Sequence, residues 1–438
     1  MPIWSEEFET MPRADLKKLQ LERLKAIVER VAHHSPCYQA KLAEAGIKAA
    51  DIKHLEDITR LPFTTKEELR CNYPWGMFAV PRNKIVRLHA SSGTTGKPIV
   101  GGYTRNDLKM WAEVMARTLS AAGITADGVV HNSHGYGLFT GGLGFHMGVE
   151  EIGATAVPVA TGLLQRQLML LEDFEATVLA CTPSYALVIA EEAITQGIDV
   201  SERLKLRIGT FGAEPWTEKM RYELEAMLHI KAHDVYGLTE MIGPGVAVEC
   251  ECQDGLHIAE DHFYPEIIDP STGEPLGYGV EGELVFTALT REAMPLLRFR
   301  TRDRTTLHAE KCSCGRTLVR MEKVLGRTDD MLIVRGVNVF PSQIERVLLE
   351  FSELEPHYQI IIDRGRHELD SLVIWVEGID SLFMPVDTAH IAILEKEVER
   401  RMREALIINC TVKLMKPHTI ERSMGKAVRV VDKRKFDG

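Results

Sequence analysis

The stretch ATVLACTPSYALVIAEEAITQG, residues 176–197, joins a short apolar run of strand-like character to a longer run with helical spacing. The same alternation extends in both directions. GVVHNS and GATAVPV come before it, LKLRIGTFG and IKAHDVYG come after it, and helical runs lie between them. Strands that alternate with helices favour a parallel sheet covered by helices. We therefore expect an α/β fold in this part of the chain.

The character of the sequence changes near Glu249. Turn-rich segments follow, with strand-like runs at PEIIDP, GELVFTAL and TTLHA, and these favour a smaller antiparallel subdomain. At residues 326–351 a polar turn leads into a strand, a loop and an amphipathic helix, and the rest of the chain is typical of a small α+β unit. We predict a large N-terminal domain over residues 1–328 and a small, mobile C-terminal α+β domain over residues 329–438.

Composition excludes several classes of function. The chain has 438 residues, of which 45% are hydrophobic and 26% charged, as in ordinary globular proteins. A net charge of −11 gives no electrostatic footprint for nucleic acid. The N-terminal segment is acidic where a secretory signal is basic, and His and Glu interrupt the most apolar region, residues 129–164. We expect a cytoplasmic protein that binds neither nucleic acid nor membrane.

The segment HASSGTTGKPIV, residues 89–100, concentrates glycine and hydroxyl groups between two strand-like runs. Glycine backbone and hydroxyls can cradle phosphate, but the Walker pattern fails because Ser91 stands where it needs glycine and Pro98 where it needs Ser or Thr. Pro98 also disfavours helix at Lys97, so we expect the loop to join two strands. Composition alone leaves open a phosphate loop and a mobile surface hairpin.

This loop is one of five motifs that occur in a fixed order. SSGTTGKP, YGLTE, FRTRD, GRTDDMLIVRG and GKAVR together resemble the motifs of the adenylate-forming superfamily. Within that superfamily, the phrases LPFTTKEELR, YGLFTGGLGFH, FGAEPWTE, GLHIAEDHF and RGVNVFPSQIE resemble phenylacetate–CoA ligases. The resemblance implies an acyl-CoA synthetase-like fold. It also implies an ATP-dependent ligase that converts phenylacetate, or a close aryl acid, to its CoA thioester through an acyl adenylate, with release of AMP and pyrophosphate.

The resemblance assigns roles to individual residues. Tyr236 would offer an aromatic face to adenine, and Asp303 would accept the ribose hydroxyls. Thr239 would contact the α-phosphate, and Glu240 would hold Mg²⁺ through a hard oxygen ligand. The nucleotide-binding residues implied in this way are Ser91, Ser92, Gly93, Thr94, Thr95, Gly96, Lys97, Gly212, Ala213, Glu214, Asp234, Tyr236, Gly237, Asp303 and Arg327. Considered without the other motifs, each could have a structural role: Glu240 as a carboxylate at a helix start, Asp303 as a surface ion-pair partner and Tyr236 as a core aromatic.

Adenylate formation brings a carboxylate to a phosphate, and these two anions repel unless a cation intervenes. By resemblance, Lys426 in the small domain is the catalytic lysine that bridges them. The CoA thiol must then reach the activated carbonyl, which Lys426 would obstruct. The resemblance implies that the small domain rotates about a hinge at Asp329.

The acid pocket is expected near HGYGLFTGGLGFH and GAEPW. Tyr136 and Phe139 are aromatic, the surrounding glycines leave room for a flat ring, and Ala213 would lie beside it. The alternative is a glycine-rich loop that packs closely on a helix, with its aromatics in the core.

The cysteine pairs predict a second site. Cys312 and Cys314 flank one residue and precede Gly315, while CECQDGLH offers Cys250, Cys252 and His257. Tetrahedral Zn²⁺ takes four such ligands, and a closed shell is structural. Two sets are open: the four cysteines, or Cys250, His257, Cys312 and Cys314. The resemblance favours the second set. Reduced cysteines on neighbouring turns remain the alternative.

The predicted cofactors and substrates are thus ATP, Mg²⁺, CoA and an aryl acid, with a structural Zn²⁺, and the resemblance implies a homodimer. Two other functions are weighed against this one. The first is a synthetase of the same fold that adenylates a deazaflavin coenzyme and uses no CoA. The second is a non-catalytic nucleotide-binding protein, which the presence of both Glu240 and Lys426 disfavours.

Overall fold

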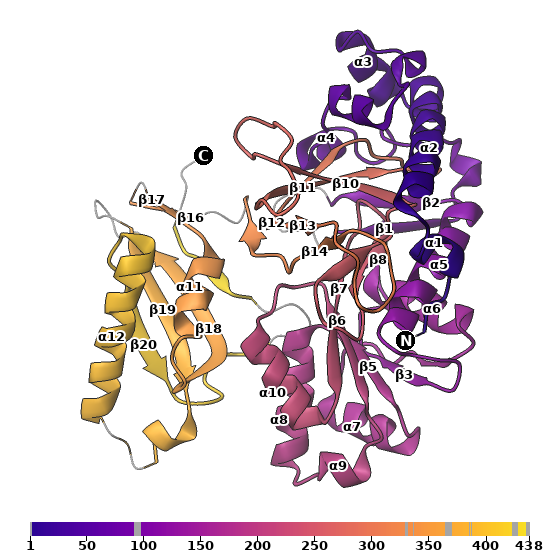
Figure 1. The fold of residues 1–438 in the computed structure, drawn as a ribbon. Coiled ribbons are helices and arrows are strands. Elements are labelled where there is room, and N and C mark those ends of the chain that lie inside the picture. Colours follow the sequence, from indigo (N-terminus) through magenta and orange to yellow (C-terminus); the bar gives the residue numbers. More distant parts are fainter. Residues whose placement is uncertain are drawn as a thin grey trace. The chain divides into compact units, whose positions relative to one another are not determined.

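The structure is a computed structural model that describes residues 2–91, 98–328, 332–335, 337–363, 370–384, 386, 388–422 and 428–434. It divides into two compact units (Figure 1). The large unit comprises Met1–Pro215 and Glu223–Val324, and the small unit comprises Trp216–Tyr222 and Leu325–Gly438. Each unit is described separately below.

A nine-stranded sheet forms the centre of the large unit (Figure 1). Its order is β13-β14-β9-β8-β7-β6-β5-β3-β4, and the strands β3 to β7 pair in parallel, as the sequence predicts. The remaining pairs are antiparallel. The strands are β3 (Val129–Asn132), β4 (Thr155–Val157), β5 (Val178–Cys181), β6 (Ile208–Gly212), β7 (Lys231–Leu238), β8 (Gly243–Glu249), β9 (Leu256–Ile258), β13 (Leu307–His308) and β14 (Arg320–Met321).

Helices pack against this sheet, and local sequence explains where two of them begin. Thr182 accepts a hydrogen bond from the backbone of Tyr185 and Pro183 occupies the first turn, which together start α8 (Pro183–Thr195) directly after the fully buried β5. Thr104 and Asp107 form a reciprocal capping box that starts α5 (Arg105–Ala121). The other helices of this region are α6 (Gly141–Glu151), α7 (Leu164–Asp173) and α9 (Val200–Arg203), whereas α10 (Glu218–Leu228) has residues in both units.

Two smaller sheets contain the other strands that concern the site. In one of them, three strands pair antiparallel: β10 (Phe263–Ile268), β11 (Gly282–Ala288) and β12 (Phe299–Thr305). This confirms the antiparallel strands predicted after residue 249. The strands β1 (Arg87–Ala90) and β2 (Val100–Tyr103) form an antiparallel hairpin, so the glycine- and hydroxyl-rich loop does join two strands.

Helices and short turns make up the N-terminal part of the chain. Two of the helices are separated at Ser35, because Pro36 begins the second of them. The elements are α1 (Glu6–Glu9), α2 (Arg13–His34), α3 (Pro36–Glu44), η1 (Ala49–Asp51), η2 (Leu55–Arg60), α4 (Lys66–Cys71) and η3 (Arg82–Lys84).

The small unit is built around a four-stranded sheet of order β20-β19-β18-β21, in which β18 and β19 are antiparallel and the outer pairs are parallel. The helices α11 and α12 pack on each other and against this sheet. The elements are β15 (Gly326–Arg327), β16 (Leu332–Val334), β17 (Val337–Val339), α11 (Pro341–Leu348), β18 (Leu354–Asp363), β19 (Ser371–Gly378), η4 (Asp380–Leu382), α12 (Thr388–Leu406), β20 (Thr411–Met415) and β21 (Val430–Asp432).

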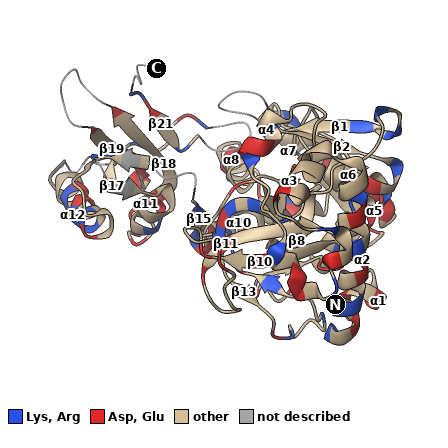
Figure 2. Cartoon of the chain, turned by 90° about the horizontal axis from the view of Figure 1, so that it is seen from above, with Lys and Arg blue, Asp and Glu red and all other residues tan. Residues whose placement is uncertain are grey.

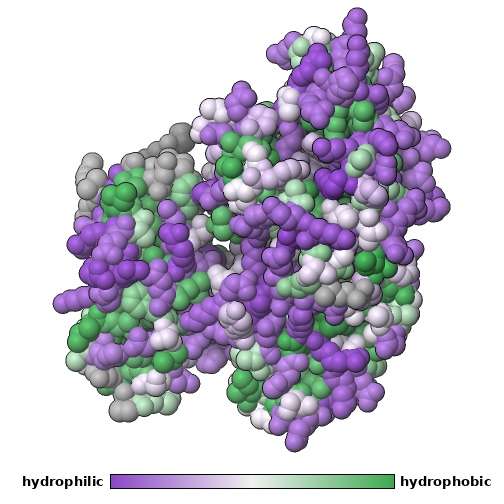
Figure 3. All heavy atoms as spheres, viewed as in Figure 1, coloured by the Kyte–Doolittle hydropathy of each residue, from purple (hydrophilic) through white to green (hydrophobic). Residues whose placement is uncertain are grey.

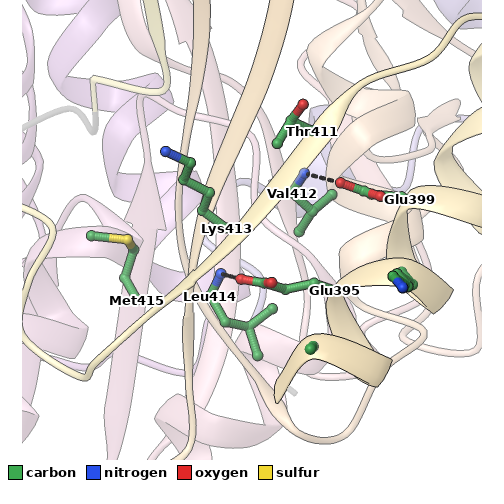
Figure 4. A pocket seen from close by; sticks show the side chains of 9 residues that line it. Glu395, Glu399, Thr411, Val412, Lys413, Leu414 and Met415 are labelled. Carbon is green, nitrogen blue, oxygen red and sulfur yellow. Dashed lines mark hydrogen bonds between the residues drawn. The ribbon is translucent and has the colours of Figure 1, made fainter. Parts of the chain in front are cut away.

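The edge strand β20 is protected by two carboxylates of α12. Glu399 accepts the N–H of Val412 at 3.0 Å and Glu395 accepts the N–H of Leu414 at 2.8 Å (Figure 4). Backbone donors on an edge strand invite pairing with another chain, and charged side chains are a usual protection. These residues line a surface groove between α12 and β20, and none of the predicted site residues lies among its lining residues.

The outer surface is mixed in charge and polarity. Both signs of charge alternate along α12 (Figure 2), where Arg400 pairs with Glu397 and Glu404. On the face shown in Figure 3, hydrophilic and hydrophobic residues are interspersed. Among the described residues, no helix has the length and apolar character needed to cross a membrane.

Candidate active site

The predicted nucleotide residues of the YGLTE motif lie at the end of β7 and in the turn that follows it. Tyr236 and Gly237 belong to the strand, and Thr239 and Glu240 belong to the turn. A Cβ on Gly237 would lie 2.0 Å from the carbonyl oxygen of Gly243, so only glycine fits where β7 and β8 meet. Glu240 is buried. The turn is therefore a packed part of the fold.

Tyr236 contacts Asp303 directly. Its phenolic hydroxyl donates a 2.6 Å hydrogen bond to Oδ2 of Asp303, which lies on β12 in a different sheet. The hydroxyl of Thr301 accepts the N–H of Asp303 at 3.0 Å, and the Asp303 side chain is buried. Two predicted site residues that are 67 positions apart in the sequence thus form one pair.

The segment after β6 approaches β7 closely. A Cβ on Gly212 would lie 2.2 Å from the carbonyl oxygen of Val235, and Ala213 adopts a left-handed conformation with φ of 72°. The Glu214 carboxylate accepts both the N–H and the hydroxyl of Ser184 at the N-terminus of α8. Gly212 and Ala213 therefore lie beside the strand that carries Tyr236, while Glu214 holds a helix.

The remaining predicted residue of β7, Asp234, has a backbone contact with the neighbouring strand. The N–H of Asp234 donates a 2.8 Å hydrogen bond to the Glu249 carboxylate on β8. Asp234 thus lies two residues before Tyr236 in the strand that leads into the turn.

Only the two ends of the predicted phosphate loop are described. The N–H of Ser91 donates to the carbonyl of Ile99 at 2.9 Å, and the hydroxyl of Ser91 accepts the N–H of Ile99 at 3.1 Å. These bonds close the base of the loop. The predicted residues Ser92, Gly93, Thr94, Thr95, Gly96 and Lys97 lie outside the described residues.

The predicted acid pocket begins at the end of β3. The amide of Asn132 donates 2.8 Å hydrogen bonds to the Tyr136 hydroxyl and to the carbonyl of Gly142. Burial raises the pKa of Tyr136 to about 12, so its hydroxyl stays protonated at neutral pH. Phe139 is half exposed. The two aromatics thus share a loop, with Tyr136 fixed and Phe139 open to solvent.

This loop is attached to β1. The carbonyl of Leu138 accepts hydrogen bonds from the N–H of Ala90 at 2.9 Å and from Nδ1 of His89 at 3.0 Å. Nearby, the ring of His134 stacks on Phe145 with centroids 4.7 Å apart, and burial lowers the pKa of His134 to about 4. His89, Asn132 and His134 carry no sequence signal that could have assigned these contacts.

Three other predicted residues belong to the small unit. Arg327 lies in β15, whereas Asp329 and Lys426 lie outside the described residues. The predicted hinge and the predicted catalytic lysine therefore rest on the sequence motifs.

The second predicted set of metal ligands comes together in the large unit. Potential ligand atoms of Cys250, His257, Cys312 and Cys314 all lie within 4.8 Å of one another, and the four side chains are buried. The sulfurs of Cys250 and Cys312 are 3.8 Å apart, and Cys314 Sγ is 3.5 Å from His257 Nε2. Three thiols and one imidazole converging in this way match the number and kind of ligands that Zn²⁺ takes.

Cys252 is not part of this cluster. Its sulfur lies 3.1 Å from the Ser313 hydroxyl, and its N–H donates to the sulfur of Cys250 at 3.4 Å. An N–H···S bond of this kind would stabilise a thiolate ligand if a metal were bound.

Comparisons with known proteins identify the family of the chain. The AMP-binding enzyme family model matches residues 23–288, and the AMP-binding enzyme C-terminal domain model matches residues 336–434. A phenylacetate-coenzyme A ligase of Thermus thermophilus is 50% identical, with 99% of this chain and 100% of that protein covered.

Solved structures give the same result for the fold. A 2-hydroxyisobutyryl-CoA ligase in the postadenylation state, in complex with 2-HIB-AMP, has a TM-score of 0.89 at 29% identity and covers 98% of this chain and 91% of that one. The same ligase in the thioesterification state, in complex with 2-HIB-AMP and CoA, has a TM-score of 0.71 at 30% identity and covers 98% and 92%. The predicted α/β fold with a large and a small domain is confirmed.

These findings also confirm the predicted enzyme class. They favour a CoA ligase over both a deazaflavin adenylyltransferase and a non-catalytic protein. The chain belongs to the AMP-binding enzymes and, within them, to the phenylacetate–coenzyme A ligases.

Proposed function

We propose that this chain activates phenylacetate or a close aryl acid in two steps at the site described above. In the first step a carboxylate oxygen of the acid attacks the α-phosphorus of ATP, the bond from that phosphorus to the β-phosphate breaks, and pyrophosphate leaves. In the second step the thiolate sulfur of CoA attacks the acyl carbon, and AMP leaves with the electron pair of the broken C–O bond.

The contact between Tyr236 and Asp303 is the observation that carries this proposal. Adenine is bonded directly to ribose, so a residue that stacks on adenine and a residue that accepts the ribose hydroxyls must be neighbours. The 2.6 Å hydrogen bond makes Tyr236 and Asp303 neighbours although they come from different sheets. Gly212 and Ala213 lie beside the same strand and can form the wall of the nucleotide pocket.

The turn after β7 would serve the phosphates. Thr239 supplies a hydroxyl for the α-phosphate, and Glu240 supplies the carboxylate that would hold Mg²⁺. When bound, Mg²⁺ neutralises charge on the phosphate oxygens. By resemblance, the residues of the loop 91–97 contact the β- and γ-phosphates, and Arg327 assists at the ribose.

The acid would bind against Tyr136, Phe139 and Ala213. Asn132 fixes the Tyr136 hydroxyl, so this ring has a defined position against which a flat aryl group can pack. Because the loop of Tyr136 and Phe139 is bonded to β1, the acid would be held close to the hairpin that carries the phosphate loop. That proximity is what attack of the carboxylate on the α-phosphorus requires.

Lys426 and Asp329 complete the mechanism. The Lys426 ammonium would bridge the carboxylate and the α-phosphate, and rotation at Asp329 would then admit the CoA thiol. The related 2-hydroxyisobutyryl-CoA ligase, which has been solved in a postadenylation and a thioesterification state, supports a mechanism with two conformations.

We also propose a structural Zn²⁺ held by Cys250, His257, Cys312 and Cys314. Four protein ligands leave no position for water or substrate, so the ion would join the β8–β9 region to the segment 312–314 without a part in catalysis. The homodimer and the cytoplasmic location stay predictions from the sequence.

Pyrophosphate release with phenylacetate, measured with and without CoA, tests the function. We expect release that depends on the acid and a phenylacetyl-CoA product when CoA is present. Asp303→Asn should raise the KM for ATP by about tenfold or more, because a charged acceptor is lost at the ribose.

Asp269→Asn, in the exposed turn after β10, is the matched control and should leave this KM unchanged. Release that is indifferent to every arylacetate would contradict the proposed function. An unchanged KM for ATP in Asp303→Asn would contradict the assignment of the ribose site.

A further inference from the structure

Arg291 is a fully buried arginine next to the turn that carries Thr239 and Glu240. It follows β11 in the sequence. Its Nη1 donates to the carbonyl oxygens of Glu240 and Met241, and its Nη2 donates to the carbonyl of Gly102 on β2 at 3.2 Å. One guanidinium therefore bonds the turn after β7 to the hairpin that carries the phosphate loop.

The turn needs these donors. Within it, the N–H groups of Met241 and Ile242 both donate to the carbonyl of Leu238. The carbonyls of Glu240 and Met241 face Arg291, and a buried carbonyl without a donor costs free energy. Arginine presents several N–H donors in one rigid plane, which suits carbonyls from two segments.

The surroundings fix the guanidinium in place. It lies over the ring of Tyr103, 4.9 Å from the centroid, and Tyr103 stacks on Trp111 with centroids 5.1 Å apart. The Tyr103 hydroxyl donates to the carbonyl of Ile242 at 2.7 Å, so the same ring holds the next carbonyl of the turn. A Cβ on Gly101 would lie 3.1 Å from the Thr239 carbonyl oxygen, which leaves β2 and the turn little room to separate.

The backbone beyond Arg291 is also anchored. The carboxylate of Asp107, in the first turn of α5, accepts the N–H of Glu292 at 2.7 Å and the N–H of Ala293 at 3.0 Å. The arginine therefore extends from a segment that is itself held, and a displacement of its guanidinium would displace the turn.

We infer that Arg291 is a positioning residue for the first half-reaction: through the carbonyls of Glu240 and Met241 it sets the position of the Thr239 hydroxyl and the Glu240 carboxylate relative to the β1–β2 hairpin. Arg291 therefore affects how the rate depends on the concentrations of Mg²⁺ and ATP, and it does not affect the binding of the aryl acid. The inference rests on the proposed function, since it takes Thr239 and Glu240 as phosphate and Mg²⁺ ligands.

Three variants of the full-length chain test it: Arg291→Met, Arg291→Lys and the control Arg117→Met. Arg117 is buried to a similar extent on α5 but pairs with Asp261 and Glu113. Pyrophosphate release is measured while Mg²⁺, ATP and phenylacetate are each varied, and Tm is measured for every variant.

Arg291→Met should raise the Mg²⁺ and ATP concentrations at half-maximal rate by about 10-fold to 100-fold, the range that a small misplacement of a catalytic group causes. Its KM for phenylacetate should stay near the wild-type value. Arg291→Lys keeps a cation but loses the rigid plane that reaches both segments, so it should recover part of the loss. Arg117→Met should lower Tm and leave all three concentrations unchanged.

Equal kinetic profiles for Arg291→Met and Arg117→Met would overturn the inference, and so would a failure of Arg291→Lys to recover.

If Arg291→Met does not fold, Tyr103→Phe removes only the donor to Ile242. This variant should shift the Mg²⁺ dependence in the same direction by a smaller factor, and no shift would overturn the inference. Glu240→Gln distinguishes a failure of the inference about Arg291 from a failure of the proposed function. A wild-type Mg²⁺ dependence in Glu240→Gln would contradict the proposed role of Glu240, whatever Arg291→Met shows.

Discussion

Arg291 in the large unit and Glu377 in the small unit each hold a chain segment in place. The two side chains do so with opposite charges. The buried guanidinium of Arg291 donates to backbone carbonyls of the turn after β7 and of β2. The Glu377 carboxylate, fully buried at the end of β19, accepts the N–H of Ile420 at 2.7 Å and of His418 at 3.0 Å. It also accepts two hydrogen bonds from Arg422, at 2.9 and 3.0 Å.

The difference follows from which backbone groups each segment leaves without a partner. The carbonyls of Glu240 and Met241 in the turn after β7 require a donor, whereas the N–H groups of His418 and Ile420 require an acceptor. Glu377 additionally has the charge of Arg422 as compensation for its burial. In each unit a single buried side chain thus anchors a segment close in sequence to proposed catalytic residues: Thr239 and Glu240 in one, Lys426 in the other.

Replacing Glu377 should have the largest effect on stability. Glu377→Ala leaves two N–H groups and the Arg422 guanidinium without their acceptor, and it should lower the free energy of unfolding of the small unit by about 3–5 kcal/mol. Hydrogen exchange of the β18 and β19 amides measures this directly. Glu377→Gln, which retains one acceptor oxygen, should recover part of the loss. Amide protection that Glu377→Ala leaves unchanged would contradict the comparison.

The proposed zinc site would be an anchor of a different kind, because a bound metal would join the two segments. Cys250→Ser should lose bound zinc and lower the Tm of the large unit by about 2 °C or more, the shift that 1–2 kcal/mol produces in a large domain. The kcat should stay within about twofold of wild type, because a closed shell takes no part in the chemistry.

Cys252→Ser is the matched control for the metal site, since Cys252 lies two residues away and its N–H donates to the sulfur of Cys250. It should retain the metal, as elemental analysis will show. Zinc content that is equal in Cys250→Ser and wild type would remove the proposed site, and zinc loss in both variants would favour the four-cysteine assignment.

The edge strand β20 tests how much burial contributes to the effect at Glu377. Glu399 also accepts a backbone N–H through its carboxylate, but it lies at the surface groove (Figure 4). Glu399→Ala should lower the free energy of unfolding by only about 0.5–1.5 kcal/mol, because water can replace the lost acceptor. Chemical denaturation measures it, and a loss as large as that of Glu377→Ala would show that burial is not the deciding factor.

Patterns local in sequence predicted much of this molecule. The alternation around residues 176–197 predicted the parallel strands, and Pro98 predicted that the glycine-rich loop joins two strands. The spacing of the cysteines, with the resemblance of GLH, predicted which four residues gather. For the strands and the loop the signal lies within a few residues of the feature, whereas the cysteine cluster joins two segments that are distant in sequence.

Contacts between distant segments left no such signal. Arg291 lies in TREAMP, a segment that reads as an ordinary polar loop, and only the packing of β2 against the turn after β7 makes it a buried donor. Glu214 was predicted in the pocket, yet its carboxylate also caps α8, 30 residues earlier in the chain. Whether a charged side chain binds solvent, backbone or substrate depends on the tertiary neighbours, which the motif does not specify.

The proposed mechanism is tested most directly by pyrophosphate release from ATP and phenylacetate in Lys426→Ala, with thioester formation from preformed phenylacetyl adenylate and CoA as the internal control. Loss of the ammonium should slow the first reaction by about 10²–10³-fold, the cost of removing one group that stabilises developing charge, and leave the second within a few-fold. Pyrophosphate release at the wild-type rate in a folded Lys426→Ala protein would contradict the mechanism.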